Sequence, residues 1–274
     1  ALFIGWELRS KRPMVDLRLF RRPAFTGAQI VAFTLSAAVF SMFLYLTLYF
    51  QNILGFSALR AGVLFLPTTA LSFFAAPIAG KLSAQVPVRL LMGAGLALDG
   101  VALLLMRGIT PHSHWTHLLP GMICLGTGVG LVNPPLASTA ISVVEPRRAG
   151  MASGTNNTFR QVGIATGIAA TGALFQHHVR GAVESALQAA HVAVDPGRLA
   201  KLASSGQIGQ ALHSLPPGAR QPIATAATSA FVGALNQIFL AGAIVAFAGA
   251  ALALLLIRGG DLAQTRGDAP APAG

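Results

Sequence analysis

The apolar positions of this chain gather into six long stretches, and loops rich in polar and charged residues separate them. The stretches are Phe25–Tyr49, Gly62–Ala79, Leu90–Met106, Leu118–Val144, Thr158–His177 and Ala226–Ile257. About 20 mostly apolar residues in a helix are enough to cross the hydrocarbon core of a bilayer. The pattern therefore predicts an all-α integral membrane protein with six transmembrane helices, surrounded by the lipid bilayer.

The segments around these stretches divide the chain into five parts. We expect residues 1–24 to hold the end of a preceding helix and a cytoplasmic segment leading into the first span, and residues 25–178 to hold spans one to five. Residues 179–225 should form a long extracytoplasmic connection, residues 226–257 the sixth span, and residues 258–274 a disordered cytoplasmic tail. The start of the connection could continue the fifth span as a helix, while SLPPGARQP predicts a break. The chain begins without methionine and does not resemble a signal peptide, which favours truncation.

The composition excludes a water-soluble protein, and the placement of the charges argues against a nucleic-acid-binding protein. Hydrophobic residues make up 54% of the chain and charged residues 10%, against roughly 25% charged in soluble domains. The net charge of +11 could attract nucleic acid. However, 13 of the 19 basic residues precede the first span, lie in every second loop or in the tail after it, or, in the case of Arg160, stand at the start of the fifth span. The positive-inside rule then predicts that both termini are cytoplasmic, with no nucleic-acid partner.

Asp99 is the acidic residue that the pattern singles out, because apolar or small residues flank it on both sides in LLMGAGLALDGVALLLM. A charge inside a membrane span costs at least about 2.5–3.5 kcal/mol, so Asp99 should face the protein interior or a water-filled cavity. It is our candidate for proton coupling. The alternative is a structural carboxyl group that bonds to a neighbouring helix or reaches water at the outer surface.

A second polar group stands where the fifth span begins, in GTNNTFRQVG. Its members could line a substrate path or an inner gate, or could simply cap the helix and hold the interface; they are Asn156, Asn157, Arg160 and Gln161. Asn133 in the fourth span leaves a similar choice, since it could line the path or satisfy a backbone carbonyl that Pro134 frees.

Glycine and proline predict how the spans pack and bend. Small residues at four-residue spacing allow helix backbones to approach closely in lipid, and the positions are Gly126, Gly130, Gly163 and Gly167. Pro134 and Pro135 should bend or locally open the fourth span. In the second span, Pro67 and Pro77 predict a kinked helix.

Motifs for metal, redox or nucleotide chemistry are weak in this sequence. His112, His114 and His117 have an H-x-H-x-x-H spacing that could suggest a metal, but no acid or cysteine accompanies them in that loop. The single cysteine, Cys124, excludes an intrachain disulfide. With no phosphate-binding loop and no nucleophile–base set, we predict neither an enzyme nor a bound metal or cofactor. A membrane metalloenzyme using the His112 loop is the remote alternative.

Three segments, read together, resemble the fourteen-helix drug:proton antiporters of the major facilitator superfamily. They are ExRSKRPMVDLRLFRRPAF from Glu7, QNILGFSALRAGVLFLP, and GTGVGLVNPPLASTAISVVEPRRAGMASGTNNTFRQVGIATGIAATGALF. The resemblance implies the end of helix eight followed by helices nine to fourteen, which is a C-terminal half whose N-terminal half is missing.

The same resemblance implies a multidrug efflux antiporter of a bacterial inner membrane, which exchanges a hydrophobic or cationic small molecule for a proton by rocking two halves. Its cytoplasmic loop residues here would be Lys81, Arg89, Arg147 and Arg148, the first two as weak inner-gate candidates. Asp99 matches no motif of that family. The alternative from a different class is a non-transporting membrane scaffold or assembly partner that binds other helices through its small-residue faces.

Overall fold

The structure is a computed structural model that describes residues 16–142, 144–189 and 216–257, and most of these residues are helical. The elements, in chain order, are η1 (Leu17–Arg21), α2 (Pro23–Leu48), η2 (Tyr49–Ile53), α3 (Ala58–Val63), α4 (Leu66–Leu82), α5 (Val88–Leu105), η3 (Trp115–Leu118), α6 (Leu119–Ser142), η4 (Pro146–Arg148), α7 (Ala149–Ala189) and α10 (Pro217–Leu256).

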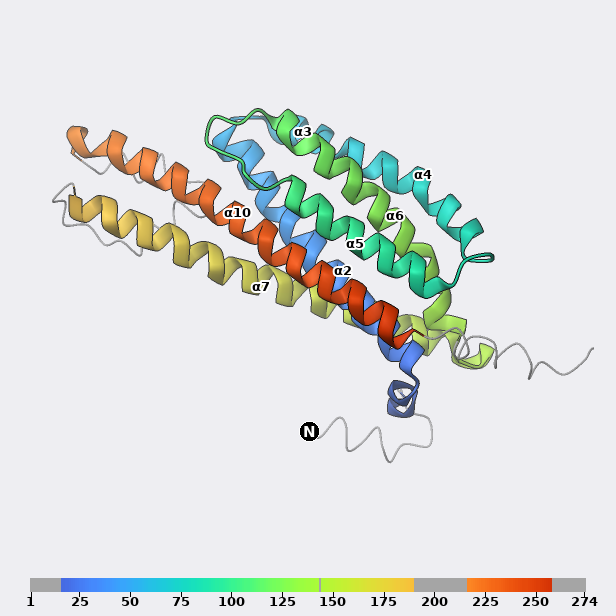
Figure 1. Ribbon diagram of the computed structural model, residues 1–274. Helices are drawn as coiled ribbons and strands as arrows, with labels where there is room; N and C mark the ends of the chain where they lie inside the picture. The colour runs from blue at the N-terminus through green and yellow to red at the C-terminus, as the bar shows by residue number, and fades with distance from the viewer. Residues whose placement is uncertain (1–15, 143, 190–215, 258–274) are drawn as a thin grey trace, which may run out of the picture.

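The long helices lie side by side in one bundle (Figure 1). Helix α6 packs between α4 and α5, α5 packs also on α10, and α2 contacts both α7 and α10. We call one end of the bundle the η1 end, because η1, η4, the starts of α2 and α7 and the end of α10 lie there. The other, which carries η3 and the start of α10, is the η3 end (Figure 1).

Five helical segments of the described chain are long and apolar enough to cross a membrane, rather than the six that we predicted. They are Pro23–Ile53, Ala58–Leu82, Val88–Leu105, Trp115–Ser142 and Pro217–Leu256. The fifth predicted stretch lies inside α7, which is 41 residues long, but Arg, Gln and His residues at both ends of that stretch lower its mean hydropathy. Helix α7 nevertheless packs along α2 and α10, within the bundle.

Prolines lie beside a break in one span and inside two continuous helices. The second span divides into α3 and α4, and the break at Leu64–Phe65 precedes Pro67. Pro77 lies inside α4, which continues past it. Helix α6 also runs without interruption through Pro134 and Pro135, so the fourth span does not open there, whereas a bend, the other effect that we allowed, stays a prediction. Neighbouring helices pack against α6 on both sides and hold it in this conformation.

The long connection predicted at 179–225 is largely helical where the structure describes it. Helix α7 extends to Ala189, and α10 already begins at Pro217. The break predicted for SLPPGARQP was therefore wrong for its last residues, since Pro217 occupies the first helical turn, where its missing N–H is not needed, and Pro222 lies within the helix. Residues 190–215, the tail 258–274 and residues 1–15 lie outside the described part.

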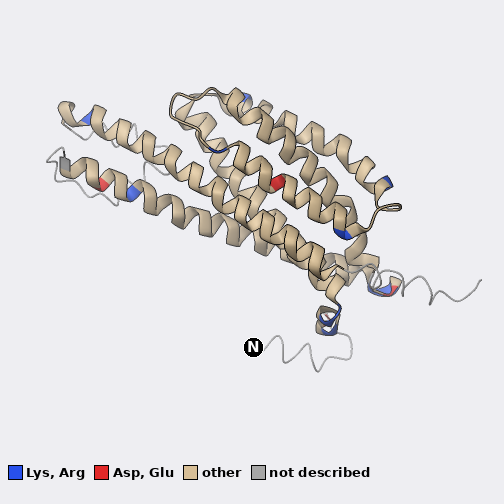
Figure 2. Ribbon diagram, in the orientation of Figure 1, with Lys and Arg blue, Asp and Glu red and all other residues tan. Residues whose placement is uncertain are grey.

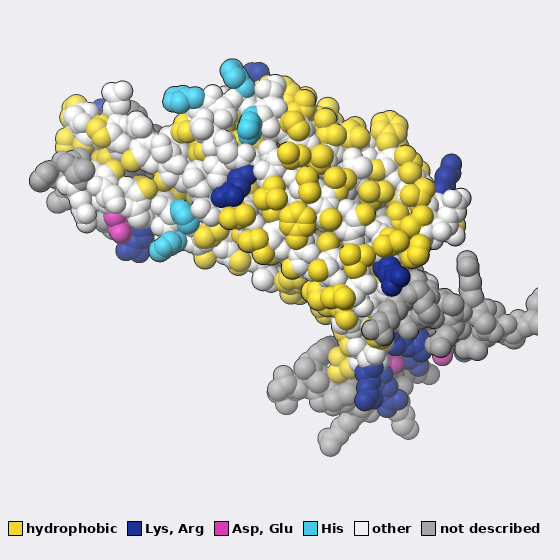
Figure 3. All heavy atoms as spheres, in the orientation of Figure 1, with side chains coloured by type: hydrophobic (Ala, Val, Ile, Leu, Met, Phe, Trp, Pro, Cys, Tyr) yellow, Lys and Arg dark blue, Asp and Glu magenta, His cyan; other side chains and the backbone are white. Residues whose placement is uncertain are grey.

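Polar and apolar side chains separate along the bundle. Lys and Arg positions lie mostly toward its two ends (Figure 2). Hydrophobic side chains cover the broad middle of the face shown in Figure 3. Phe73 and Phe74 on α4 are 72% and 65% exposed, which would be unfavourable in water but suits contact with lipid chains.

Candidate functional site

Glycines on opposite faces of α6 bring it into backbone contact with two different helices. Gly126 and Gly130 face α4, where a Cβ atom would collide with the Thr68 carbonyl group and with Ala75. Gly128 faces α5, where a Cβ atom would collide with Asp99 Oδ1 and lie 2.7 Å from the Gly95 carbonyl oxygen. Residues two apart point to nearly opposite sides of a helix because each residue turns the chain by about 100°. We call this contact region, made of Gly95, Asp99, Gly126, Gly128 and Gly130, the glycine seam.

Asp99 lies buried in the glycine seam. Its exposed fraction is 0%, and neither carboxyl oxygen has a hydrogen-bond partner among the described residues. The α5–α6 approach that excludes water from Asp99 depends on Gly95 and Gly128, since a side chain at either position would hold the helices apart. The seam thus has room for a carboxyl group but supplies it with no counter-charge.

A second polar contact joins α6 to α7. Arg160 Nη2 donates a hydrogen bond to Asn133 Oδ1, and Asn133 Nδ2 donates to the Val129 carbonyl at 3.0 Å. Prolines 134 and 135 free the carbonyls of Gly130 and Leu131, four residues before them. Asn133 therefore bonds to neither freed carbonyl, contrary to one of our two readings, and instead orients its oxygen toward Arg160.

One turn earlier, α7 makes a buried polar contact with α2. Asn156 Nδ2 donates to Gln29 Oε1 at 3.3 Å, and both side chains are buried. Helix α7 begins at Ala149, so Asn156 and Asn157 lie well inside it and are not helix caps. We call Gln29, Asn133, Asn156 and Arg160 the polar junction.

The remaining members of the predicted polar group lie on the surface. Asn157 and Gln161 are exposed, whereas Arg160 is partly buried. Gly163 and Gly167, on the other face of α7, contact the α2 backbone at Phe33 and Ala37. Helix α7 therefore presents small residues to the bundle and leaves polar residues next to the junction uncovered.

The structure does not bring Asp99 and Arg160 together. Their α6 neighbours, Gly128 and Asn133, are five residues apart, which is about 7.5 Å along the axis, and they point to different faces. Helix α6 therefore separates a buried acid from a partly exposed base.

The predicted loop residues lie at the η1 end. Lys81 is in the last turn of α4 and Arg89 in the first turn of α5, and both are exposed. Arg147 and Arg148 form η4, and Arg148 Nη1 contacts Asp16 Oδ2 at 2.7 Å.

Three polar residues that our sequence reasoning passed over take part in these contacts. Gln29 belongs to the polar junction, and Asp16 pairs with Arg148. Asn236 of α10 accepts hydrogen bonds from the Gly108 and Ile109 amides at 2.8 and 3.2 Å. The signal for Gln29 and Asn236 was an amide side chain within an apolar stretch, which favours a specific partner.

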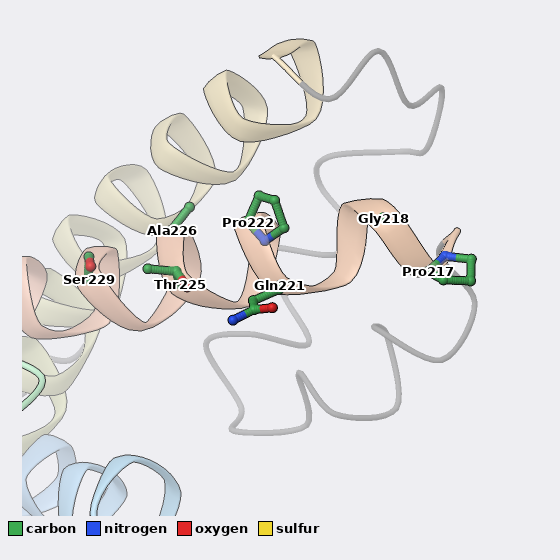
Figure 4. A pocket seen from close by; sticks show the side chains of 7 residues that line it. All are labelled: Pro217, Gly218, Gln221, Pro222, Thr225, Ala226 and Ser229. Atoms are coloured by element: carbon green, nitrogen blue, oxygen red, sulfur yellow. The ribbon is translucent and has the colours of Figure 1, made fainter.

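The histidine loop shows no metal geometry. Within residues 16–142, 144–189 and 216–257, no three His, Cys, Asp or Glu side chains come close enough to hold a metal ion. His117 Nε2 instead lies 3.2 Å from the Arg107 carbonyl oxygen. At the η3 end, a surface hollow of about 680 Å³ follows one face of α10 (Figure 4). Its lining is Pro217, Gly218, Gln221, Pro222, Thr225, Ala226 and Ser229, all far along the bundle from Arg160.

Comparison with known proteins establishes the family. The model of the Major Facilitator Superfamily matches residues 5–168, which is more than half of the chain, so the chain belongs to this superfamily of membrane transporters. The predicted all-α membrane fold is thereby confirmed, and the protein is a multi-pass membrane protein and not an enzyme.

Similar proteins carry names that refer to drug resistance. The chain is 32% identical to the multidrug resistance protein Stp of Mycobacterium tuberculosis, over 69% of this chain and 35% of that protein. It is 33% identical to the methylenomycin A resistance protein of Streptomyces coelicolor, over 63% and 36%. It is 30% identical to the methyl viologen resistance protein SmvA of Salmonella typhimurium, over 85% and 46%. The chain therefore spans less than half the length of these relatives.

A solved structure shows the same fold. A bacterial homologue of the human lysosomal transporter Spinster, in an inward-facing and occupied conformation, superposes with a TM-score of 0.64 at 18% identity, covering 92% of this chain and 51% of that one.

Proposed function

We propose that this chain forms the C-terminal half of a proton-coupled multidrug efflux transporter of the bacterial inner membrane. The drug-resistance names of its relatives support drugs as the substrate class. The coverage of about half of a solved transporter supports a two-part machine, in which a second bundle completes the substrate path. Membership of the fourteen-helix branch is part of this proposal.

The observation that carries the proposal is the polar junction. Within the part of the chain that the structure describes, the Arg160 side chain bonds to one other helix, through Asn133, and exposed Asn157 and Gln161 lie beside it. Polar groups at membrane depth mark substrate or ion pathways. We assign this uncovered face of α7 to the substrate path and to an inner gate, which the other half would close.

Asp99 is our proposed proton-binding residue. An ionised carboxylate there would be buried without a counter-charge, so the packing that we observe accommodates the neutral acid. Proton release would then require α5 and α6 to separate or water to enter the seam. Such a coupling of protonation to helix packing is what an antiporter needs.

We further propose that the η1 end faces the cytoplasm, so that both termini are cytoplasmic. In this arrangement α7 crosses the membrane despite its lower mean hydropathy. The alternative scaffold function receives less support, because the small-residue faces that would bind other helices are already in contact with α2, α4 and α5.

The test is efflux driven by an imposed pH gradient in membrane vesicles that contain the full transporter. Asp99→Asn should reduce export of a cationic dye by about tenfold or more, as expected when a proton relay is removed. Glu184→Gln is the matched control, since it removes a carboxylate from the η3 end of α7 and should leave export unchanged. Undiminished export by a folded Asp99→Asn variant would refute the role of Asp99.

A second measurement tests the two-part arrangement. Reconstituted alone in proteoliposomes, the chain should not transport the dye when a proton gradient is imposed, because the second helical bundle that would complete the substrate path is absent. Transport by the isolated chain would contradict the proposal.

A further inference from the structure

Two arginine-bearing turns from distant parts of the sequence are fastened together at the η1 end. Asp16 Oδ2 contacts Arg148 Nη1 at 2.7 Å, and Asp16 Oδ1 accepts a hydrogen bond from the Arg18 amide at 3.0 Å. The Asp16 amide also lies 3.3 Å from Met151 Sδ. Asp16 thus holds η1, which precedes α2, against η4, which precedes α7.

Apolar packing supports the same arrangement. Phe20 contacts the rings of Phe25 and Phe159 at centroid distances of 5.3 and 5.7 Å, and Leu19 joins a small buried cluster with Val144 and Ala152. With both turns seated in this way, their arginines stay at the surface. Arg18, Arg21, Arg147 and Arg148 are exposed. We call these four arginines together with Asp16 the arginine clasp.

We infer that the arginine clasp binds the headgroup of an anionic phospholipid. Helix α2, a membrane-length segment, begins at Pro23, two residues after η1, so the clasp lies at the depth of the headgroups. The planar guanidinium group matches the geometry of a phosphate, to which it can donate two hydrogen bonds. Basic clusters next to a membrane span are the usual binding sites of acidic lipids.

An exposed apolar residue that is close in sequence to the clasp favours a lipid over a soluble polyanion. Ile141, in the last turn of α6 just before η4, is 41% exposed. A ligand with a phosphate and an acyl chain could contact both features, whereas a nucleic acid would use the arginines alone. The inference rests on the proposed function only in placing this end at the cytoplasmic leaflet.

Substitution of Asp16 distinguishes a positioned binding site from simple electrostatic attraction. Asp16→Asn makes this end more positive, so simple attraction predicts tighter binding of an anionic lipid. If Asp16 positions the arginines, the same substitution releases η1 from η4 and weakens binding. The two explanations therefore predict opposite signs.

The experiment is a titration of the purified protein in detergent with short-chain phosphatidylglycerol, followed by native mass spectrometry of the retained lipid. Arg18→Gln/Arg147→Gln should weaken phosphatidylglycerol binding by about fivefold or more, and Asp16→Asn should weaken it as well. The matched control is Lys81→Gln/Arg89→Gln, which removes the same charge from the same end of the bundle and should change binding by less than about twofold.

Several outcomes would overturn the inference. These are equal weakening by the control pair, tighter binding after Asp16→Asn, equally tight binding of phosphatidylcholine, or displacement of the lipid by a short oligonucleotide at similar concentration. If Asp16→Asn does not fold, the arginine pair and its control still decide the question. Because the titration measures no transport, its failure is distinct from a failure of the efflux proposal.

Discussion

Two contact regions of α6 have opposite character. In the glycine seam, α6 meets α4 and α5 backbone to backbone, with Gly126, Gly128 and Gly130 leaving no space for a Cβ atom. In the polar junction, α6 meets α7 through one side-chain hydrogen bond between Asn133 and Arg160. In the seam, an added side-chain atom would push the helices apart. In the junction, the hydrogen bond between the two side chains can break and form again without moving the helix backbones.

This difference suggests where the bundle is rigid and where it can move. Close-packed contacts have few alternative arrangements, so α4, α5 and α6 should move as one body. A hydrogen bond between partly exposed side chains contributes little to stability and can exchange with water or a ligand. We therefore expect conformational change to begin at the junction. Protonation of the buried Asp99 should instead depend on how closely α5 and α6 pack in the seam.

The largest effect on stability should follow from substitution in the seam. Gly126→Ala places a methyl group against the Thr68 carbonyl of α4, and we expect a loss of about 1–3 kcal/mol in unfolding free energy from overpacking. Gly154→Ala is the control, because that glycine lies on an open face of α7 and alanine favours a helix by up to about 1 kcal/mol. Thermal unfolding in detergent, followed by circular dichroism, measures both. Equal melting temperatures for the two variants would contradict a close-packed seam.

An intermediate effect is expected at Asn236, which fastens the loop between α5 and α6 to α10. Asn236→Ala removes the acceptor for two amides and a donor to the Ile109 carbonyl, and we expect a loss of about 1–2 kcal/mol. Gly108, at φ +87°, shows that this loop adopts a conformation that needs such support. The control is Asn157→Ala on the exposed face of α7, which should shift unfolding by less than about 0.5 kcal/mol. If it destabilises the protein as much as Asn236→Ala does, the loop contact has no special role.

The smallest effect on stability should come from the junction, together with a large effect on transport. Arg160→Gln should lower the unfolding free energy by less than about 1 kcal/mol, because its partner contact is partly exposed. A double-mutant cycle with Asn133→Ala, read by thermal unfolding, should give a coupling energy of similarly small size. Dye export by the full transporter should fall sharply in Arg160→Gln. A strongly destabilised Arg160→Gln protein would show that the junction is structural instead.

The hydrophobic pattern predicted most of the fold because lipid imposes one requirement on every span. Each apolar stretch of sufficient length must form a helix that satisfies its own backbone, and the helices lie where the stretches are. The hydrophobic pattern gave wrong predictions where local composition does not determine whether a helix continues. Pro217 and Pro222 predicted a break, yet α10 contains both. Arg, Gln and His residues lowered the mean hydropathy of α7, which is nevertheless one continuous helix.

The candidate site was only partly predictable. Asp99, Asn133, Asn156 and Arg160 stood out because polar groups are costly within apolar stretches. Their partners did not, since Gln29 and Asp16 are more than 120 residues from the groups that they contact. Pairings of this kind depend on which helix faces come together.

The sequence by itself determined the class of protein, the positions of the membrane helices, the depth of the polar residues and the separation of charge toward the ends, because these follow from the transfer of each residue between lipid and water. Only the tertiary structure decided that Gly128 encloses Asp99, that Asn133 bonds to Arg160 rather than to a freed carbonyl, and that Asp16 joins two arginine turns. The physical reason is that hydropathy depends on each residue alone, whereas a contact depends on the rotation and register of two helices at once.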